Sequence, residues 1–116
     1  MKIKLPTRLH PLGVSYSIIY KTKVTENNDE LSGLCDPHKR TIEISLGNNL
    51  TAEEVFSTLF HETIHALLYQ SGLSSILDNE QVEEGLVVML ENSLAPHIKQ
   101  KSGLYSDWKE IEIEGK

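Results

Sequence analysis

The chain has 116 residues, of which 39% are hydrophobic, and this is enough apolar material for the core of one compact domain. The formal net charge of -6 and the pI near 5.3 argue against a nucleic-acid-binding surface, because neutralising phosphates requires clustered Lys and Arg. We therefore expect a single domain over residues 1–116 and no nucleic-acid partner.

The sequence also bears on the compartment. Cys35 is the only cysteine, so no intramolecular disulfide can form, and a reducing compartment is the simplest interpretation. The first seven residues contain no apolar run typical of a signal peptide, and no stretch of about 18 apolar residues suggests a membrane span. We expect a cytoplasmic protein in which Cys35 is a small buried hydrophobe or a thiol that flanks a turn, rather than a nucleophile.

The first fifty residues are typical of β-strands. Residues 16–24 are rich in β-branched and aromatic side chains, and the polar cluster at residues 26–30 predicts a loop. Residues 41–46 alternate between apolar and polar side chains, which indicates a strand with one buried face, and residues 33–35 suggest a further strand. Together these segments predict a short antiparallel sheet.

A helix is predicted over residues 52–71. Thr51 and Glu54 form a capping box, in which the two side chains satisfy free backbone amides at the helix start. Apolar residues then recur at helical spacing, and Gly72 supplies the left-handed residue that often follows a helix C-terminus.

A second helix is predicted from a cap at residues 78–81 to a stop at Pro96. Gly85 is unusual inside a helix and is expected to allow close approach to the first helix. Residues 108–113 alternate in polarity and could form an edge strand or a frayed tail. The apolar face expected for the second helix comprises Val82, Leu86, Met89, Leu90 and Leu94.

The segment His61-Glu62-Thr63-Ile64-His65 lies within the first predicted helix. Residues four apart on a helix share one face, so His61 and His65 can present imidazole nitrogens to one metal ion. Glu62 follows the first histidine and can take a proton from metal-bound water. The pattern predicts a metal site with Glu62 as general base; the alternative is an amphipathic helix that carries two histidines for structural reasons alone.

A catalytic zinc site usually has three protein ligands and an open position, so a third ligand is needed. Gly72 lies seven residues beyond His65, or about 10 Å along the helix. A second helix that runs antiparallel from the next cap returns to the level of His65 after about seven residues, near Glu84. Glu84 is the predicted third ligand. Glu80 is the alternative ligand or a hydrogen-bonding partner for a histidine, and Glu83 is expected to face solvent.

Residues 58–68, together with residues 80–84, resemble small phage and prophage metallopeptidase-like proteins, the minigluzincins of the ImmA/IrrE kind. The resemblance implies an α+β fold in which a short antiparallel β-sheet packs on the HExxH helix and on a second, glutamate-bearing helix. It also implies a zinc metallopeptidase. The family's ExxAN pattern aligns its glutamate with Glu84, but Val87 and Val88 replace the Ala and Asn, so any hydrogen bond from that Asn is lost.

The predicted reaction is peptide-bond hydrolysis. Zn²⁺ bound by His61, His65 and Glu84 would lower the pKa of a bound water toward about 7, and Glu62 would accept its proton. The strand at residues 41–46 is expected to pair with an extended peptide or protein substrate. The candidates for stabilising the oxyanion are Tyr16, Tyr69, Tyr105 and His97.

Two other hypotheses fit the sequence. One is a catalytically inactive zinc-binding structural or protein-interaction module, in which activity was lost together with the missing Asn. The other is an interaction module without metal. Neither the cleavage specificity nor the oligomeric state has a signature in the sequence.

Overall fold

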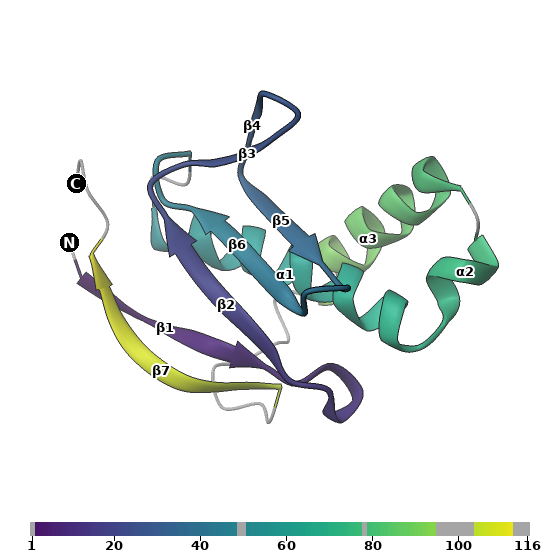
Figure 1. Cartoon of the computed structure of the whole chain (residues 1–116), viewed down its shortest axis with the longest axis horizontal. Helices are drawn as coiled ribbons and strands as arrows, with labels where there is room; N and C mark the ends of the chain where they lie inside the picture. The colour runs from purple at the N-terminus through teal and green to yellow at the C-terminus, as the bar shows by residue number, and fades with distance from the viewer. Residues whose placement is uncertain (1, 49–50, 78, 95–103, 113–116) are drawn as a thin grey trace.

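The computed structural model of the chain describes residues 2–48, 51–77, 79–94 and 104–112. They form an α+β fold in which one long helix, α1, packs against one face of a five-stranded sheet (Figure 1). The strands are β1 (Lys2–Leu9), β2 (Tyr16–Lys21), β3 (Val24–Glu26), β4 (Asp29–Leu31), β5 (Gly33–Asp36), β6 (Thr41–Ser45) and β7 (Tyr105–Glu112). The helices are α1 (Ala52–Gln70), α2 (Leu73–Leu77) and α3 (Glu80–Leu94), with a short 3-10 turn, η1 (Pro11–Gly13).

The sheet has the order β5-β6-β2-β1-β7 and is mixed. β2 and β6 run parallel, whereas the other neighbouring strands are antiparallel. The prediction of an antiparallel sheet is therefore wrong at one pair. The reason lies between β2 and β6, where the β3–β4 hairpin reverses the chain and β5 returns antiparallel to β6. After these two reversals β6 runs in the same direction as β2.

The predicted loop at residues 26–30 is largely the turn of the β3–β4 hairpin. Asn27 and Asn28 have φ angles of 53° and 72°. Asparagine tolerates this left-handed region, and two such residues form the tight turn that matches the twist of an antiparallel pair. The hairpin divides the strand predicted over residues 16–24 into β2 and β3. The further strand predicted at residues 33–35 is confirmed as β5.

Two apolar clusters hold α1 in place. The first joins the inner face of the sheet to α1 and consists of Leu5, Leu9, Tyr16, Ile18, Ile42, Ile44, Val55, Leu59, Ala66 and Tyr105. The second joins α1 to α3 and consists of Phe60, Ile64, Leu68 and Val87. Because both clusters bury side chains of α1, they fix its rotation about its own axis. The histidines of α1 are positioned by this packing.

The ends of α1 agree with the prediction to within one residue. The Thr51 hydroxyl oxygen accepts a hydrogen bond from the Glu54 backbone N–H at 3.1 Å, as expected for an N-cap. Gly72 has a φ of 83°, the left-handed conformation that glycine adopts without a steric cost. The five-residue helix α2, which follows Gly72, was not predicted.

Helix α3 begins after Asn79, whose side-chain oxygen accepts hydrogen bonds from the backbone N–H groups of Gln81 and Val82 at 2.9 and 3.2 Å. A cap in this region is therefore confirmed, while residue 78 and Pro96 lie outside the described residues. The apolar face of α3 was partly mispredicted. Val82 and Met89 are exposed, whereas Leu86, Val87 and Leu90 pack toward α1.

Gly85 does not mediate close helix approach, contrary to the prediction. A Cβ built on Gly85 would meet no atom within 4 Å. Gly85→Ala is therefore expected to raise the free energy of unfolding by about 0.5–1 kcal/mol, because alanine loses less backbone entropy in a helix. Urea denaturation of the two proteins measures this difference. Destabilisation by the alanine would show that Gly85 has a packing role.

The C-terminal described strand, β7, lies at the edge of the sheet and pairs antiparallel with β1. Of the two alternatives for residues 108–113, an edge strand or a frayed tail, the described residues 108–112 form the edge strand, which begins earlier, at Tyr105. Trp108 and Tyr105 pack with Phe56 of α1, so this strand closes one end of the core. Within the described residues, no helix has the length and apolar character needed to cross a bilayer.

Candidate metal centre

His61 and His65 lie one turn apart on α1, with ring centroids 5.2 Å apart. The capped N-terminus and the two apolar clusters hold this helix, so the two imidazoles leave it on the face that neither cluster covers. Both side chains are partly buried. The prediction that the two residues share one face is confirmed, and neither imidazole points into the apolar core.

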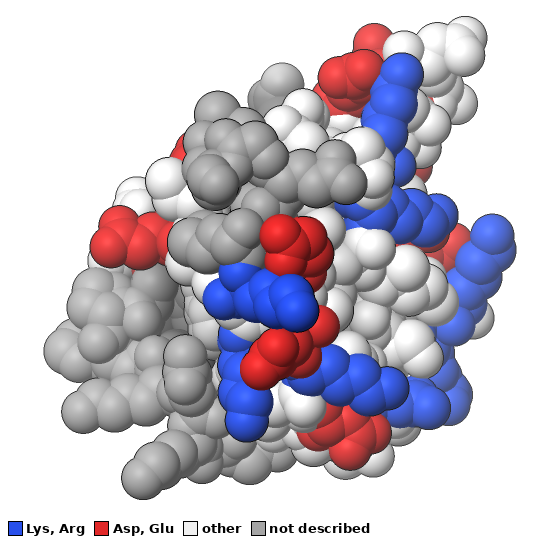
Figure 2. Space-filling view, turned by 90° about the vertical axis from the view of Figure 1, so that its left-hand side faces the viewer, with Lys and Arg blue, Asp and Glu red and all other residues white. Residues whose placement is uncertain are grey.

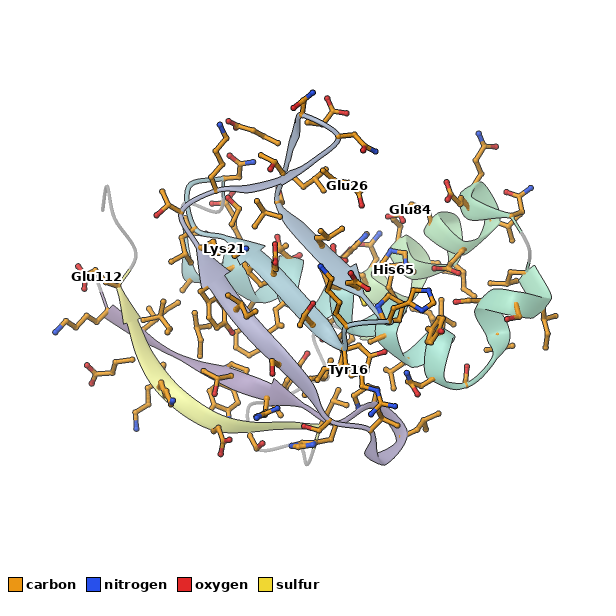
Figure 3. The ribbon with its side chains drawn as sticks, viewed as in Figure 1. Tyr16, Lys21, Glu26, His65, Glu84 and Glu112 are labelled. Atoms are coloured by element: carbon orange, nitrogen blue, oxygen red, sulfur yellow. The ribbon has the colours of Figure 1, made fainter. Side chains whose placement is uncertain are left out.

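Glu84 of α3 lies between the two histidines. One carboxylate oxygen is 2.7 Å from His61 Nε2 and the other is 3.0 Å from His65 Nε2. The potential ligand atoms of the three residues all lie within 4.8 Å of one another, so this group could hold a metal ion. Figure 3 shows His65 and Glu84 together where α1 and α3 face each other. The sequence argument for Glu84 therefore placed it correctly beside the histidines.

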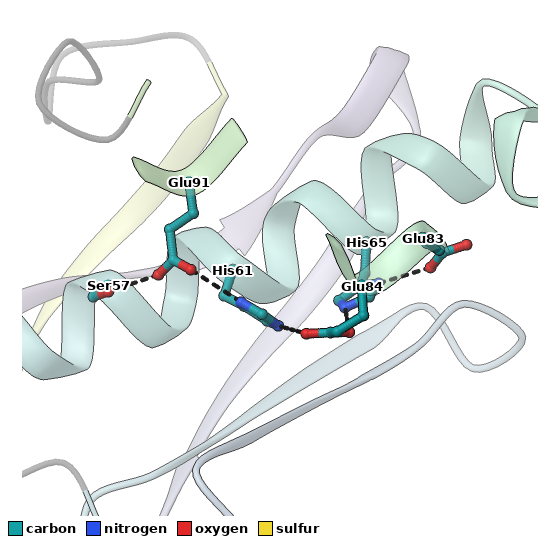
Figure 4. Close-up of polar contacts among 6 residues, drawn as sticks. All are labelled: Ser57, His61, His65, Glu83, Glu84 and Glu91. Carbon is teal, nitrogen blue, oxygen red and sulfur yellow. Dashed lines mark hydrogen bonds and ion pairs between the residues drawn. The ribbon is translucent and has the colours of Figure 1, made fainter. Parts of the chain in front are cut away.

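Two further glutamates of α3 contact the Nδ1 atoms of the histidines. Glu91 lies 3.1 Å from His61 Nδ1 and also accepts a hydrogen bond from the Ser57 hydroxyl at 2.7 Å. Glu83 lies 2.8 Å from His65 Nδ1. Figure 4 shows these contacts as one continuous chain from Ser57 to Glu83. Each imidazole thus has a carboxylate on Nδ1, which leaves Nε2 directed toward Glu84.

The role of Glu83 corrects the prediction that it faces solvent. Its side chain is only 22% exposed because α3 is rotated so that Glu83 and Glu84 flank His65 on two sides. Glu91 was missed altogether. Its spacing gave a signal, since a residue seven positions beyond Glu84 returns to the same helix face after two turns.

Glu80, the alternative third ligand, lies at the start of α3 and is exposed. It lines the same cleft as the histidines but is absent from the group whose ligand atoms converge. Antiparallel packing explains this placement. Ser57 and His61 meet Glu91, whereas His65 meets Glu83 and Glu84, so Glu80 lies beyond the level of His65.

Glu62 has a different environment from the other glutamates. It is only 9% exposed, it lines the cleft, and no described residue hydrogen-bonds to its carboxylate. Burial raises the pKa of Glu62, and the neighbouring imidazoles of His65 and His61 offset this effect only in part. Gly33 of β5 lies close enough that a Cβ there would be 3.1 Å from Glu62 Cγ. Glycine at this position lets the strand cover Glu62.

The pKa of His61 responds to opposing influences. Burial lowers it, but the hydrogen bond to Glu91 and the negative charges of Glu62 and Glu84 outweigh burial, so the pKa lies above its ordinary value. A positive charge on His61 is therefore favoured at this position. The same carboxylates would favour any other cation held there.

The site opens into a cleft of about 780 Å³ between β5, the β3–β4 hairpin and the two helices. Of the tyrosines considered as oxyanion stabilisers, Tyr69 lines the cleft and is partly exposed. Tyr16 and Tyr105 are buried and hydrogen-bond to Gln70 and Thr63, respectively. His97 lies outside the described residues. Tyr69 is thus the tyrosine of the three that a ligand in the cleft could reach.

The strand predicted to bind substrate is in the wrong place for that role. β6 lies between β5 and β2, and both of its edges are paired. β5 is the terminal strand of the sheet, and its residues Gly33, Leu34 and Cys35 line the cleft. The alternation of polarity in residues 41–46 indicated a strand with one buried face, but it does not indicate the order of strands in the sheet. The sheet edge beside the candidate metal centre belongs to β5.

Cys35 is partly buried at the wall of the cleft, as expected for a packing residue. Burial, with a smaller contribution from the charge of Glu62, raises its pKa to about 12. At pH 8 we expect iodoacetamide to alkylate Cys35 at least about 10²-fold more slowly than in the urea-unfolded chain, because the thiolate is the reactive species. The rate should keep rising above pH 9 rather than level off. Mass spectrometry measures both rates, and equal rates would contradict this environment.

Comparisons of the chain with family models, curated proteins and solved structures find no match. The resemblance to the minigluzincins therefore stays a prediction. Function is inferred from the chemistry of the residues in the cleft.

Proposed function

We propose that this chain is a zinc-dependent peptidase of the minigluzincin type, with His61, His65 and Glu84 as metal ligands and Glu62 as general base. One observation supports the proposal above all others. Two imidazole nitrogens and a carboxylate converge in a cleft that also contains a buried carboxylate without a hydrogen-bond partner among the described residues. A merely structural pair of histidines would not require this second carboxylate.

The donor set suits zinc. Two imidazoles and one carboxylate form a ligand set of catalytic zinc sites. Histidine ligands commonly hydrogen-bond through the other ring nitrogen to a carboxylate, which fixes the ring and raises its basicity. Glu91 and Glu83 occupy this position on His61 and His65. A zinc ion held here would act as a Lewis acid and lower the pKa of a bound water toward about 7.

The chain's own residues would supply the remaining chemistry. Glu62 would accept a proton at its carboxylate and return it to the leaving amine, and its raised pKa brings it closer to neutrality, where such exchange is efficient. The outer edge of β5, which pairs with no other described strand, would align an extended peptide through backbone hydrogen bonds. Tyr69 is the candidate for stabilising the oxyanion.

Zinc binding and hydrolysis can be tested separately. Zinc at about 100 times its Kd should raise the free energy of unfolding by about 2.7 kcal/mol, and calorimetry measures this shift. A peptide mixture incubated with the zinc-loaded protein should show cleavage products by mass spectrometry, and a chelator should abolish them. Stabilisation without cleavage would support the inactive zinc-binding module. If zinc neither stabilised the protein nor led to cleavage, the result would support an interaction module that binds no metal.

Glu91→Gln is expected to weaken zinc binding about 10- to 100-fold. The amide can still accept a hydrogen bond from Ser57, but it lacks the negative charge that supports His61. Titration against a competing chelator measures the affinity. The matched control is Glu110→Gln, an exposed residue of β7 outside the cleft, which should leave the affinity within about twofold. Equal losses in the two variants would show that only net charge matters.

A further inference from the structure

The basic residues of this chain lie outside the segment that forms its three helices. Between Arg40 and Lys99 the sequence contains nine Asp and Glu and no Lys or Arg. This segment supplies α1, α2 and α3. Figure 2 shows Lys and Arg side chains, interspersed with Asp and Glu, on the side of the molecule away from α2 and α3. The segment that forms the three helices therefore contributes negative charge and no Lys or Arg.

The cleft itself has the same imbalance. Five glutamates line it, and neither Lys nor Arg is among its lining residues: Glu26, Glu62, Glu80, Glu83 and Glu84. Walls of one sign focus the electrostatic field and raise the local concentration of oppositely charged ligands. A cleft of this kind repels anionic segments and attracts cationic ones.

Three of these glutamates already have roles. Glu84 faces both histidines and Glu83 contacts His65. Glu62 is buried, lines the cleft and has no hydrogen-bond partner among the described residues. Glu26 and Glu80 are the two glutamates of the cleft to which no role has been assigned above.

Glu26 and Glu80 have no ion-pair partner among the described residues. The two lysines that precede Glu26 in the chain are engaged elsewhere, since Lys23 pairs with Glu30 at 3.1 Å and Lys21 pairs with Glu43 at 3.0 Å. Glu26 ends β3 and Glu80 begins α3, so the two carboxylates come from different walls of one cleft. Figure 3 shows Glu26 on the same side of the molecule as Glu84 and His65.

We propose that the cleft selects peptide segments rich in Lys or Arg, and that Glu26 and Glu80 are the residues that recognise their cationic side chains. This inference rests on the proposed peptidase function, because it assigns the substrate class of the same cleft. Carboxylates on two walls can pair with basic side chains that leave an extended peptide in different directions. Glu26 and Glu80 line the same cleft as Gly33, Leu34 and Cys35 of β5, along whose outer edge the peptide would bind.

The test uses the zinc-loaded full chain carrying Glu62→Gln, so that binding is measured without turnover. Three short fluorescein-labelled peptides are compared by anisotropy, identical except that alternate positions carry lysine, glutamine or glutamate. The lysine peptide should bind at least about tenfold more tightly than the glutamine peptide, and the glutamate peptide should bind most weakly. Raising the salt from about 50 to about 200 mM should remove most of this preference.

Substitutions at Glu26 and Glu80 then test whether these two residues recognise the lysine side chains. Adding Glu26→Gln and Glu80→Gln together should weaken binding of the lysine peptide about 3- to 10-fold and leave the glutamine peptide unchanged. The matched control, Glu53→Gln with Glu110→Gln, changes the net charge equally at exposed positions outside the cleft and should have less than about a twofold effect. Equal binding of the lysine and glutamine peptides would overturn the proposal, as would equal losses in the two double variants.

A last measurement separates this inference from the peptidase proposal. The chain with Glu62 intact is incubated with the lysine and glutamine peptides, and the products are analysed by mass spectrometry. Faster cleavage of the lysine peptide supports both proposals. A lysine preference in binding without any cleavage supports recognition of cationic peptides and contradicts the peptidase function. Cleavage with no preference in binding or rate contradicts the charge selection alone.

Discussion

Glu62→Gln is expected to lower kcat/KM for peptide hydrolysis by about 10²- to 10⁴-fold while zinc binding is retained. Glutamine has nearly the same shape as glutamate but cannot accept and return a proton. The substitution also removes a buried charge whose pKa is raised by burial, so the folded protein should not lose stability at neutral pH. Metal analysis, thermal melting and hydrolysis of a fluorogenic peptide measure the three quantities on one preparation.

The control for this variant is Glu53→Gln, which removes a glutamate from the exposed first turn of the same helix. It should keep both zinc and hydrolysis. If Glu62→Gln retained most of the activity, another group would have to serve as the base. If it lost zinc as well as activity, Glu62 would belong to the ligand set instead.

Local signals explain why α1 and its histidines were predictable. The Thr51 cap, the apolar spacing and Gly72 all act within a few residues, so each is legible in the sequence. The position of Glu84 followed from the fixed rise of a helix and from the assumption that the second helix runs antiparallel. A distance along a helix axis is predictable in this way to about one turn.

The supporting carboxylates were not predictable to the same degree, because they depend on the rotation of α3 about its axis. Apolar residues occur on more than one side of α3, and the exposed Val82 and Met89 looked as suitable for burial as Val87. Packing against Phe60 and Ile64 selects Val87. With Val87 buried, Glu83 and Glu91 face the histidines. Because the buried face of α3 was mispredicted, the contacts of these two glutamates with His65 and His61 were not predicted either.

The order of strands in the sheet could not be predicted for a different reason. β1 and β7 pair although about a hundred residues separate them in the chain, and β6 pairs parallel with β2 across the β3–β4 hairpin. Alternation of polarity identifies a strand and its buried face but not its neighbours. As a result β6 was expected at the edge beside the helix, whereas β5 occupies that edge.

Glu84→Gln is expected to weaken zinc binding by about 10²- to 10³-fold, whereas Glu80→Gln should change the affinity by less than about threefold. Glu84 contacts Nε2 of both histidines, and an amide in its place is a poor ligand for zinc. Glu80 lies in the same cleft and on the same helix, so the pair separates a ligand from a nearby negative charge.

Stability of the metal-free protein provides the second readout for this pair. The Glu84 side chain is 51% exposed, so its contacts with the histidines are accessible to water and its replacement should shift the melting temperature without zinc only slightly. The difference between the variants should therefore emerge only when zinc is added, as a loss of metal-induced stabilisation in Glu84→Gln. If Glu80→Gln lost zinc instead, the third ligand would be Glu80 in the first turn of α3. The contacts of Glu84 with the two imidazoles would then be ion pairs that play no part in binding the metal.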